Sequence, residues 1–109
     1  MNKIALIIDN DEISNKKALN FLKLGGFEPI VKTSILDGFE FIKKQHKEIC
    51  VVLIEPKLIY FPLLLKILKE EELYSHIKII LYKSSSINDH QLIKLDKEYF
   101  DDPLNFFKF

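Results

Sequence analysis

The feature that most constrains this chain is the alternation of short apolar runs with longer stretches of helical periodicity. The apolar runs are continuous rather than alternating, which is typical of strands buried on both faces of a sheet. The stretches between them are long enough to return over the sheet as helices. We therefore expect an α/β fold with a five-stranded parallel sheet and helices on both faces. The predicted strands are residues 3–8, 28–33, 49–54, 77–82 and 99–101.

Residues with capping chemistry lie where the predicted helices begin and end. Ser34 followed by Asp37 has the layout of a capping box, with Asp in place of the commoner Glu. Gly25 and Gly26 supply a helix stop, because glycine accepts a positive φ. Pro62 suits the first turn of a third helix, where its missing N–H costs nothing.

Each predicted helix carries one apolar face. The first helix is expected over residues 13–24 and a fourth around 87–95. An apolar stripe that repeats every three to four residues is expected to face the sheet. The inward-facing residues are predicted to be Ile13, Ala18, Leu19 and Leu22 in the first helix and Leu63, Leu64, Ile67 and Leu68 in the third.

Length and composition predict one cytoplasmic domain over residues 1–109. A chain of this size can enclose one core but not two. No apolar run approaches the roughly 20 residues that span a bilayer, so we expect no membrane partner. The first apolar run ends in Asp9 without the layout of a signal peptide. Cys50 is the only cysteine, so a buried, reduced thiol is expected.

The balance of charges argues against nucleic-acid binding. All 16 basic residues are lysines, and 16 acids offset them. Proteins that bind nucleic acids usually carry a basic surplus and use the planar guanidinium of arginine. We therefore expect no nucleic-acid partner for this domain alone, and the dispersed lysines are interpreted as solvated helix faces.

Polar residues follow the predicted strands at the end where parallel sheets carry their sites. In open parallel sheets, binding sites lie beyond the carboxyl ends of the strands, near the point where the strand order reverses. An acid at a strand end is often there simply because solvent begins at that point. The residues placed at this edge are Asp9, Asn10, Glu55, Tyr82, Lys83, Asp101 and Asp102.

With this order of elements, the chain resembles the receiver domain of two-component response regulators, a flavodoxin-like domain of bacterial signalling. In that family an acidic pair follows the first strand, an aspartate after the third strand accepts a phosphoryl group, and a Thr or Ser ends the fourth. Here Asp9 and Asn10 stand at the acidic-pair position. Glu55 falls at the phosphoacceptor position, and Tyr82 at the Thr/Ser position.

The resemblance extends to the fifth strand. Family members carry Lys-Pro after that strand, whereas this chain has Asp102 followed by Pro103. Tyr99 matches the aromatic residue that changes rotamer in receivers that switch. It is equally well explained as a packing aromatic.

Four departures from the family pattern predict that phosphotransfer is lost. Glu55 is one methylene longer than aspartate, and a displacement near 1 Å can slow in-line transfer about a hundredfold. Asn10 removes an anionic ligand for Mg²⁺, and Tyr82 fills the space of a small hydroxyl group. Asp102 would repel a phosphoryl group by roughly 3 kcal/mol at about 5 Å, where the family has an attractive lysine.

The same positions suggest other roles for the acids. Glu55 would imitate a phosphorylated aspartate in one alternative, but that imitation relies on the lysine that Asp102 replaces. We expect no cofactor; if a metal binds, Asp9 and Glu55 are the candidates to hold Mg²⁺. Our hypothesis is that Lys83 supplies the missing positive charge near these acids.

The resemblance implies a protein-binding role rather than an enzymatic one. Family receivers close with a fifth helix, whereas only Leu104–Phe109 remain here, so we expect either that the chain is cut from a longer protein or that the last helix is short or missing. The exposed apolar surface would then bind a protein partner or a second copy. The predicted function is a phosphorylation-independent, receiver-like interaction module. The alternatives are a receiver still phosphorylated by a histidine kinase or small phosphodonor, and a flavodoxin-like cofactor-binding protein.

Overall fold

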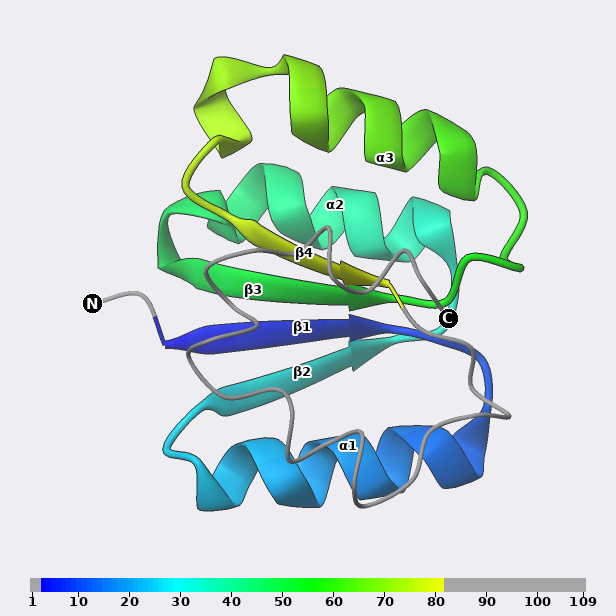
Figure 1. Cartoon of the computed structure of the whole chain (residues 1–109), viewed down its shortest axis with the longest axis vertical. Helices are drawn as coiled ribbons and strands as arrows, with labels where there is room; N and C mark the ends of the chain where they lie inside the picture. Colours follow the sequence, from blue (N-terminus) through cyan, green and yellow to red (C-terminus); the bar gives the residue numbers. More distant parts are fainter. Residues whose placement is uncertain (1–2, 82–109) are drawn as a thin grey trace.

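The computed structural model describes residues 3–81, which form a four-stranded, all-parallel sheet between two layers of helix (Figure 1). The strand order is β2-β1-β3-β4, so β1 lies inside the sheet and the chain reverses direction across it. This order is compatible with a flavodoxin-like fold. The predicted fifth strand lies outside the described residues. The strands are β1 (Ile4–Ile8), β2 (Glu28–Lys32), β3 (Ile49–Ile54) and β4 (Lys78–Leu81).

The helices cover both faces of the sheet, as predicted. One helix, α1, lies on one face, and α2 and α3 lie side by side on the other (Figure 1). Two short 3₁₀ turns, His46–Glu48 and Glu72–Tyr74, lead from α2 and α3 into the next strands. The α-helices are α1 (Glu12–Leu24), α2 (Ile35–Gln45) and α3 (Phe61–Glu70).

The predicted helix boundary signals are confirmed. The Ser34 hydroxyl accepts a hydrogen bond of 3.1 Å from the Asp37 N–H at the start of α2. Gly26 takes a φ of 88° just after α1, a conformation that favours glycine. Pro62 lies in the first turn of α3.

Two apolar layers enclose the sheet. Ala5 and Ile7 of β1 face α1, where they pack with Ala18 and Leu22. The alternate residues of the same strands pack toward α2 and α3. The residues of this second layer include Leu6, Ile8, Val52 and Ile54 of the strands, Ile42 of α2, and Leu64 and Leu68 of α3.

Two predicted core residues are wrong. Ile13 is 74% exposed, and Leu63 is 57% exposed. On α1 the buried face is instead formed by Ser14 and Asn15 near its start. The first turn of α1 meets polar backbone at the strand ends rather than the apolar sheet, so its inward positions hold polar residues.

Cys50 lies in β3 and is half-buried rather than buried. Its Sγ donates a hydrogen bond of 3.3 Å to the Ile4 carbonyl on the neighbouring strand. Partial burial raises the pKa of this thiol, because desolvation disfavours the thiolate. The thiol therefore acts as a small packing group with little nucleophilic character at neutral pH.

Within residues 3–81, no helix combines the length and apolar character that crossing a bilayer requires.

Candidate functional site at the carboxyl edge of the sheet

Two acids lie at the carboxyl ends of the two central strands. Ile8 of β1 is paired with Ile54 of β3, so the residues that follow them leave the sheet at the same level. The Glu55 N–H donates to the Ile8 carbonyl at 3.0 Å. The Asp9 N–H donates to the carbonyl of Lys32, at the end of β2, at the same distance. The sheet's hydrogen bonding therefore continues into both acidic residues and fixes their backbones.

Both acidic side chains are buried. Asp9 is 0% exposed and Glu55 is 3% exposed. Asp9 Oδ1 accepts a hydrogen bond of 3.0 Å from the Asp11 N–H, and Glu55 Oε1 accepts one of 3.3 Å from the Lys57 N–H. Each carboxylate thus organises the loop that follows it. A buried acid is tolerable only when such donors compensate its lost hydration.

The start of α1 is capped by an acidic side chain. Asp11 is the N-cap residue, and its Oδ1 accepts from the Ser14 N–H at 3.0 Å. Asn15 Nδ2 donates to the Asp9 carbonyl at 2.8 Å. Asp9 and Asp11 therefore occupy backbone N–H groups that a phosphate would need at this helix end.

The loop from β3 to α3 is built from consecutive tight turns. The Leu58 N–H donates to the Glu55 carbonyl at 3.2 Å, and the Phe61 N–H donates to the Leu58 carbonyl at 3.1 Å. Tyr60, the residue before α3, has a φ of 69°, which is uncommon for a non-glycine residue. The turns hold Tyr60 in this left-handed conformation. The loop between β3 and α3 is therefore a series of hydrogen-bonded turns that begins at the Glu55 carbonyl.

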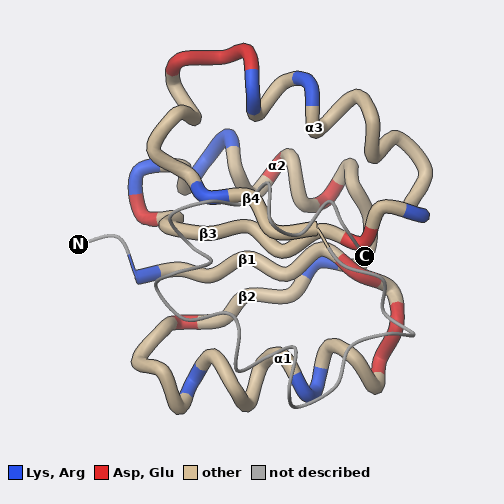
Figure 2. The backbone as a smooth tube through the Cα atoms, viewed as in Figure 1, with Lys and Arg blue, Asp and Glu red and all other residues tan. Residues whose placement is uncertain are grey.

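Acidic segments gather at this edge, where β1 and β3 end and α1 begins (Figure 2). Asp9 and Glu55 are buried, whereas Asn10 is exposed. Asp9 and Glu55 are the proposed metal candidates, but no group of three or more His, Cys, Asp or Glu residues that could hold a metal ion occurs within residues 3–81. The two carboxylates alone would leave most positions around an octahedral Mg²⁺ to water or ligand.

A pocket of about 470 Å³ lies beside this edge, between α1 and β2. Asn15 contributes to its wall, and the Oδ1 of this amide is buried without a hydrogen-bond partner among the described residues. Lys16 and Glu12 provide one charge of each sign. The lining residues are Asn10, Glu12, Asn15, Lys16, Leu19, Val31 and Thr33.

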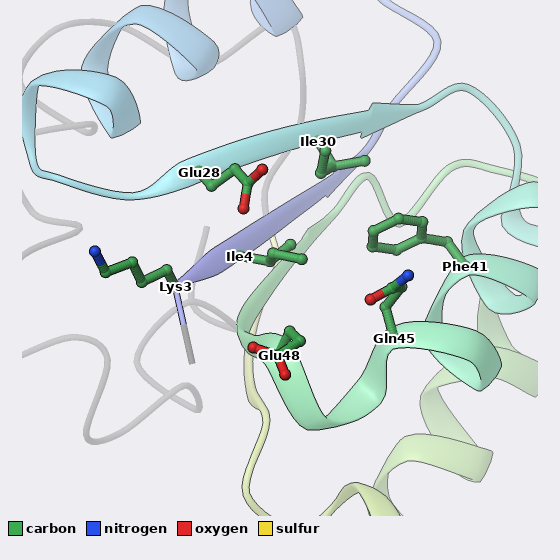
Figure 3. A pocket seen from close by; sticks show the side chains of 7 residues that line it. All are labelled: Lys3, Ile4, Glu28, Ile30, Phe41, Gln45 and Glu48. Atoms are coloured by element: carbon green, nitrogen blue, oxygen red, sulfur yellow. The ribbon is translucent and has the colours of Figure 1, made fainter. Parts of the chain in front are cut away.

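A second pocket, of about 410 Å³, lies at the opposite, amino end of the strands (Figure 3). Phe41 and Gln45 of α2 face Ile4 and Ile30 of the sheet across it. Its rim carries acids and one lysine. Because it is at the far end of the sheet from Glu55, this pocket is separate from the predicted site. The lining residues are Lys3, Ile4, Glu28, Ile30, Phe41, Gln45 and Glu48.

Part of the predicted site is therefore assembled, and part lies outside the described residues. Asp9 and Glu55 come together through the pairing of β1 with β3, and Asn10 follows at the surface. Leu81, the last described residue, is paired with Ile54, so β4 reaches the same edge. The predicted positions beyond it are Tyr82, Lys83, Tyr99 and Asp102, which are not among the described residues.

Sequence reasoning missed three features of this edge. The acids are buried rather than at the solvent boundary; Asn15 holds the carbonyl of Asp9; and Tyr60 adopts a left-handed backbone. One local signal was available for the first: an acid two residues before a polar N-cap, as Asp9 is before Asp11, can accept the backbone N–H of the N-cap residue in an Asx turn. No sequence signal predicted the left-handed backbone conformation of Tyr60.

No protein-family model and no curated protein matches this chain. The resemblance to receiver domains consequently depends on the strand-end residues and their spacing. What it implies for function is a proposal.

Proposed function

We propose that this chain is a phosphorylation-independent, receiver-like interaction module of bacterial signal transduction that acts in the cytoplasm by binding protein. The observation that carries the proposal is the state of the Glu55 side chain. It stands at the end of the central strand β3, is 3% exposed, and uses Oε1 to accept the Lys57 N–H. This carboxylate supports the following loop and is poorly placed to act as a nucleophile.

Burial opposes phosphoryl transfer for a geometric reason. The attacking oxygen must approach phosphorus in line with the leaving group, and that requires open space on the solvent side of the carboxylate. Glu55 has almost no solvent-accessible surface. The added methylene of glutamate displaces the oxygens further from the geometry that an aspartate would give.

The neighbouring residues weaken binding of the Mg²⁺ ion that phosphoryl transfer needs. Because Asn10 is neutral and exposed, the charged ligands left for Mg²⁺ are Asp9, whose Oδ1 accepts the Asp11 N–H, and Glu55, whose Oε1 accepts the Lys57 N–H. Fewer anionic oxygen ligands mean weaker binding of Mg²⁺. Without the metal, the charge that develops on a transferring phosphoryl group is not neutralised.

The flavodoxin-like alternative is disfavoured by the first loop. A bound flavin or nucleotide would place its phosphate at the start of α1, where free N–H groups attract anions. Here the carboxylates of Asp9 and Asp11 accept the N–H groups of Asp11 and Ser14. These carboxylates would repel a phosphate. The binding partner that fits the site better is therefore a protein.

Titration with Mg²⁺ and beryllofluoride, followed by amide NMR spectra, tests this function. Beryllofluoride occupies the place of a phosphoryl group on a reactive carboxylate. We expect the amide signals of residues 55–58 to stay within the change produced by Mg²⁺ alone, because the Glu55 carboxylate is enclosed. Shifts confined to these residues and abolished in Glu55→Gln would establish the phosphorylatable alternative instead.

A further inference from the structure

The loop that Glu55 anchors presents a cluster of exposed apolar side chains. Ile59 is 73% exposed, Tyr60 is 50% exposed and Leu63 is 57% exposed, all within five residues of one another. We call these three residues the α3-entry patch. Leu63 lies in the first turn of α3, and Ile59 and Tyr60 come immediately before that helix, so the three exposed side chains lie close together along the chain. Large apolar residues gathered at one place on a surface commonly mark a binding site.

The patch is held rigidly. The turn hydrogen bonds that begin at the Glu55 carbonyl end at Phe61, and the Leu64 N–H donates to the Tyr60 carbonyl at 3.2 Å. Tyr60 keeps a left-handed backbone in the middle of this series. Such a conformation costs about 1 kcal/mol or more for a non-glycine residue and persists only where the surroundings impose it. A preorganised apolar loop loses little entropy when a partner binds.

The charges around the patch are mainly positive. Lys57 precedes it and Lys66 follows Leu63 by one helical turn, and both side chains are exposed. Figure 2 shows the basic segment in the loop between β3 and α3. The neighbouring helix α2 begins with the exposed Leu36 and the acid Asp37. The patch therefore combines apolar anchors with a net positive rim.

We propose that the α3-entry patch is the protein-binding surface of this module and that its partner is a short apolar segment carrying acidic residues. The apolar side chains of the partner would contact Ile59, Tyr60 and Leu63, and its carboxylates would pair with Lys57 and Lys66. Complementary rim charges select the partner more than they add affinity. The assignment rests on the proposed function, because it names the surface through which that module would act.

Two synthetic peptides that share the same leucine and phenylalanine anchors test the surface. One carries glutamates between the anchors, and the other carries lysines. With the full chain, free of Mg²⁺ and phosphate donors, we expect the acidic peptide to shift amide signals of residues 57–66 and to bind about fivefold tighter than the basic peptide. Equal binding of the two peptides, or no shift at millimolar concentration, would overturn the proposal.

Charge exchange gives the sharper comparison. The variant Lys57→Glu/Lys66→Glu is expected to reverse the preference, so that the basic peptide binds tighter. The matched control Lys17→Glu/Lys47→Glu makes the same change of net charge at two exposed lysines outside the patch and should keep the wild-type preference. Far-UV circular dichroism checks that both variants are folded. A reversal in both variants would show that net charge, and not this surface, selects the peptide.

Shortening the Leu63 side chain tests whether the apolar residues of the patch contribute to peptide binding. Leu63→Ala should weaken the acidic peptide several-fold, whereas Leu24→Ala, at a residue that is 90% exposed on α1, should leave it unchanged. Concentration-dependent signals at the patch without peptide would assign it to a second copy of the chain. Patch signals that move when residues 104–109 are deleted would assign it to this chain's own tail. Either result would contradict the proposal that an acidic peptide segment binds this patch. Neither result would change the outcome of the beryllofluoride titration, which tests the proposed function separately.

Discussion

Ile7→Ala is expected to lower the free energy of unfolding by about 2–5 kcal/mol. Ile7 is fully buried in β1, an interior strand, and its side chain packs with Ala18 and Leu22 of α1. Truncation removes apolar contacts and leaves a cavity that the neighbouring strands cannot close. A domain of this size has a total stability of roughly 5–15 kcal/mol, so this single change would remove a large share of it. Urea unfolding monitored by circular dichroism measures the loss.

Ile13→Ala is the matched control for this experiment. The same truncation at Ile13 removes a side chain that is 74% exposed on α1. Alanine also has the higher helix propensity, so stability should change by no more than about 0.5 kcal/mol. The sequence pattern alone predicted Ile13 to face the core. Comparable losses for the two variants would therefore contradict the orientation of α1 described above.

Gly38→Ala is expected to destabilise the protein by about 2 kcal/mol, although alanine favours helix. Gly38 is buried in α2, and a β-carbon there would overlap Ile8 Cδ1 and lie 2.9 Å from Ile8 Cγ1. Overpacking of this kind costs up to about 3 kcal/mol, while the better helix propensity returns about 1 kcal/mol. Thermal and urea unfolding of the single variant measure the net effect.

A double-mutant cycle tests the stated cause. Ile8→Val removes the Cδ1 atom that the new β-carbon would meet. The double variant Gly38→Ala/Ile8→Val should therefore be at least about 1 kcal/mol more stable than the sum of the two single effects predicts. Additive losses within about 0.5 kcal/mol would show that the close approach of α2 to β1 at this point is not the source of the penalty.

The fold could be predicted where the residue pattern determines it locally. The continuous apolar run at 49–54 became β3 with the same bounds, and Ser34 caps α2 as its spacing with Asp37 predicts. The orientation of helix faces was harder to predict. Leu63 and Leu64 are adjacent leucines, and only the crossing of α3 over the sheet decides that Leu64 is buried and Leu63 exposed. That choice depends on tertiary packing, which one-dimensional periodicity leaves open.

In the candidate site, too, some features could be predicted from the sequence and others could not. The alternation of strands with helices along the chain predicts a parallel sheet, and in the sheet that forms, the pairing of β1 with β3 brings Asp9 and Glu55 to one edge. Their burial does not follow from it, because an acid that ends a strand is as often solvated as enclosed. The carboxylates accept short-range hydrogen bonds from the backbone N–H groups of Asp11 and Lys57. The first has a sequence signal, the Asx turn at Asp9, whereas the second depends on the conformation of the loop after Glu55.

Glu55 is central both to the proposed loss of phosphotransfer and to the proposed binding surface at the α3-entry patch. Its backbone extends β3, its carboxylate accepts the Lys57 N–H, and its carbonyl starts the turns that lead to Tyr60. Under the proposed function, Glu55 stands where a phosphorylated receiver would carry its phosphoryl group. Here the same position supports a fixed loop with exposed apolar side chains. A module arranged in this way would present its binding surface without a phosphoryl group.

The most direct test is to incubate the native chain with Mg²⁺ and a radiolabelled small phosphodonor and to measure protein-bound phosphate. A response-regulator receiver domain with an intact aspartate serves as the positive control, and Glu55→Gln as the negative control. We predict that the native chain retains no more label than Glu55→Gln. Stoichiometric, alkali-labile phosphate on the native chain that is absent from Glu55→Gln would contradict the proposed function.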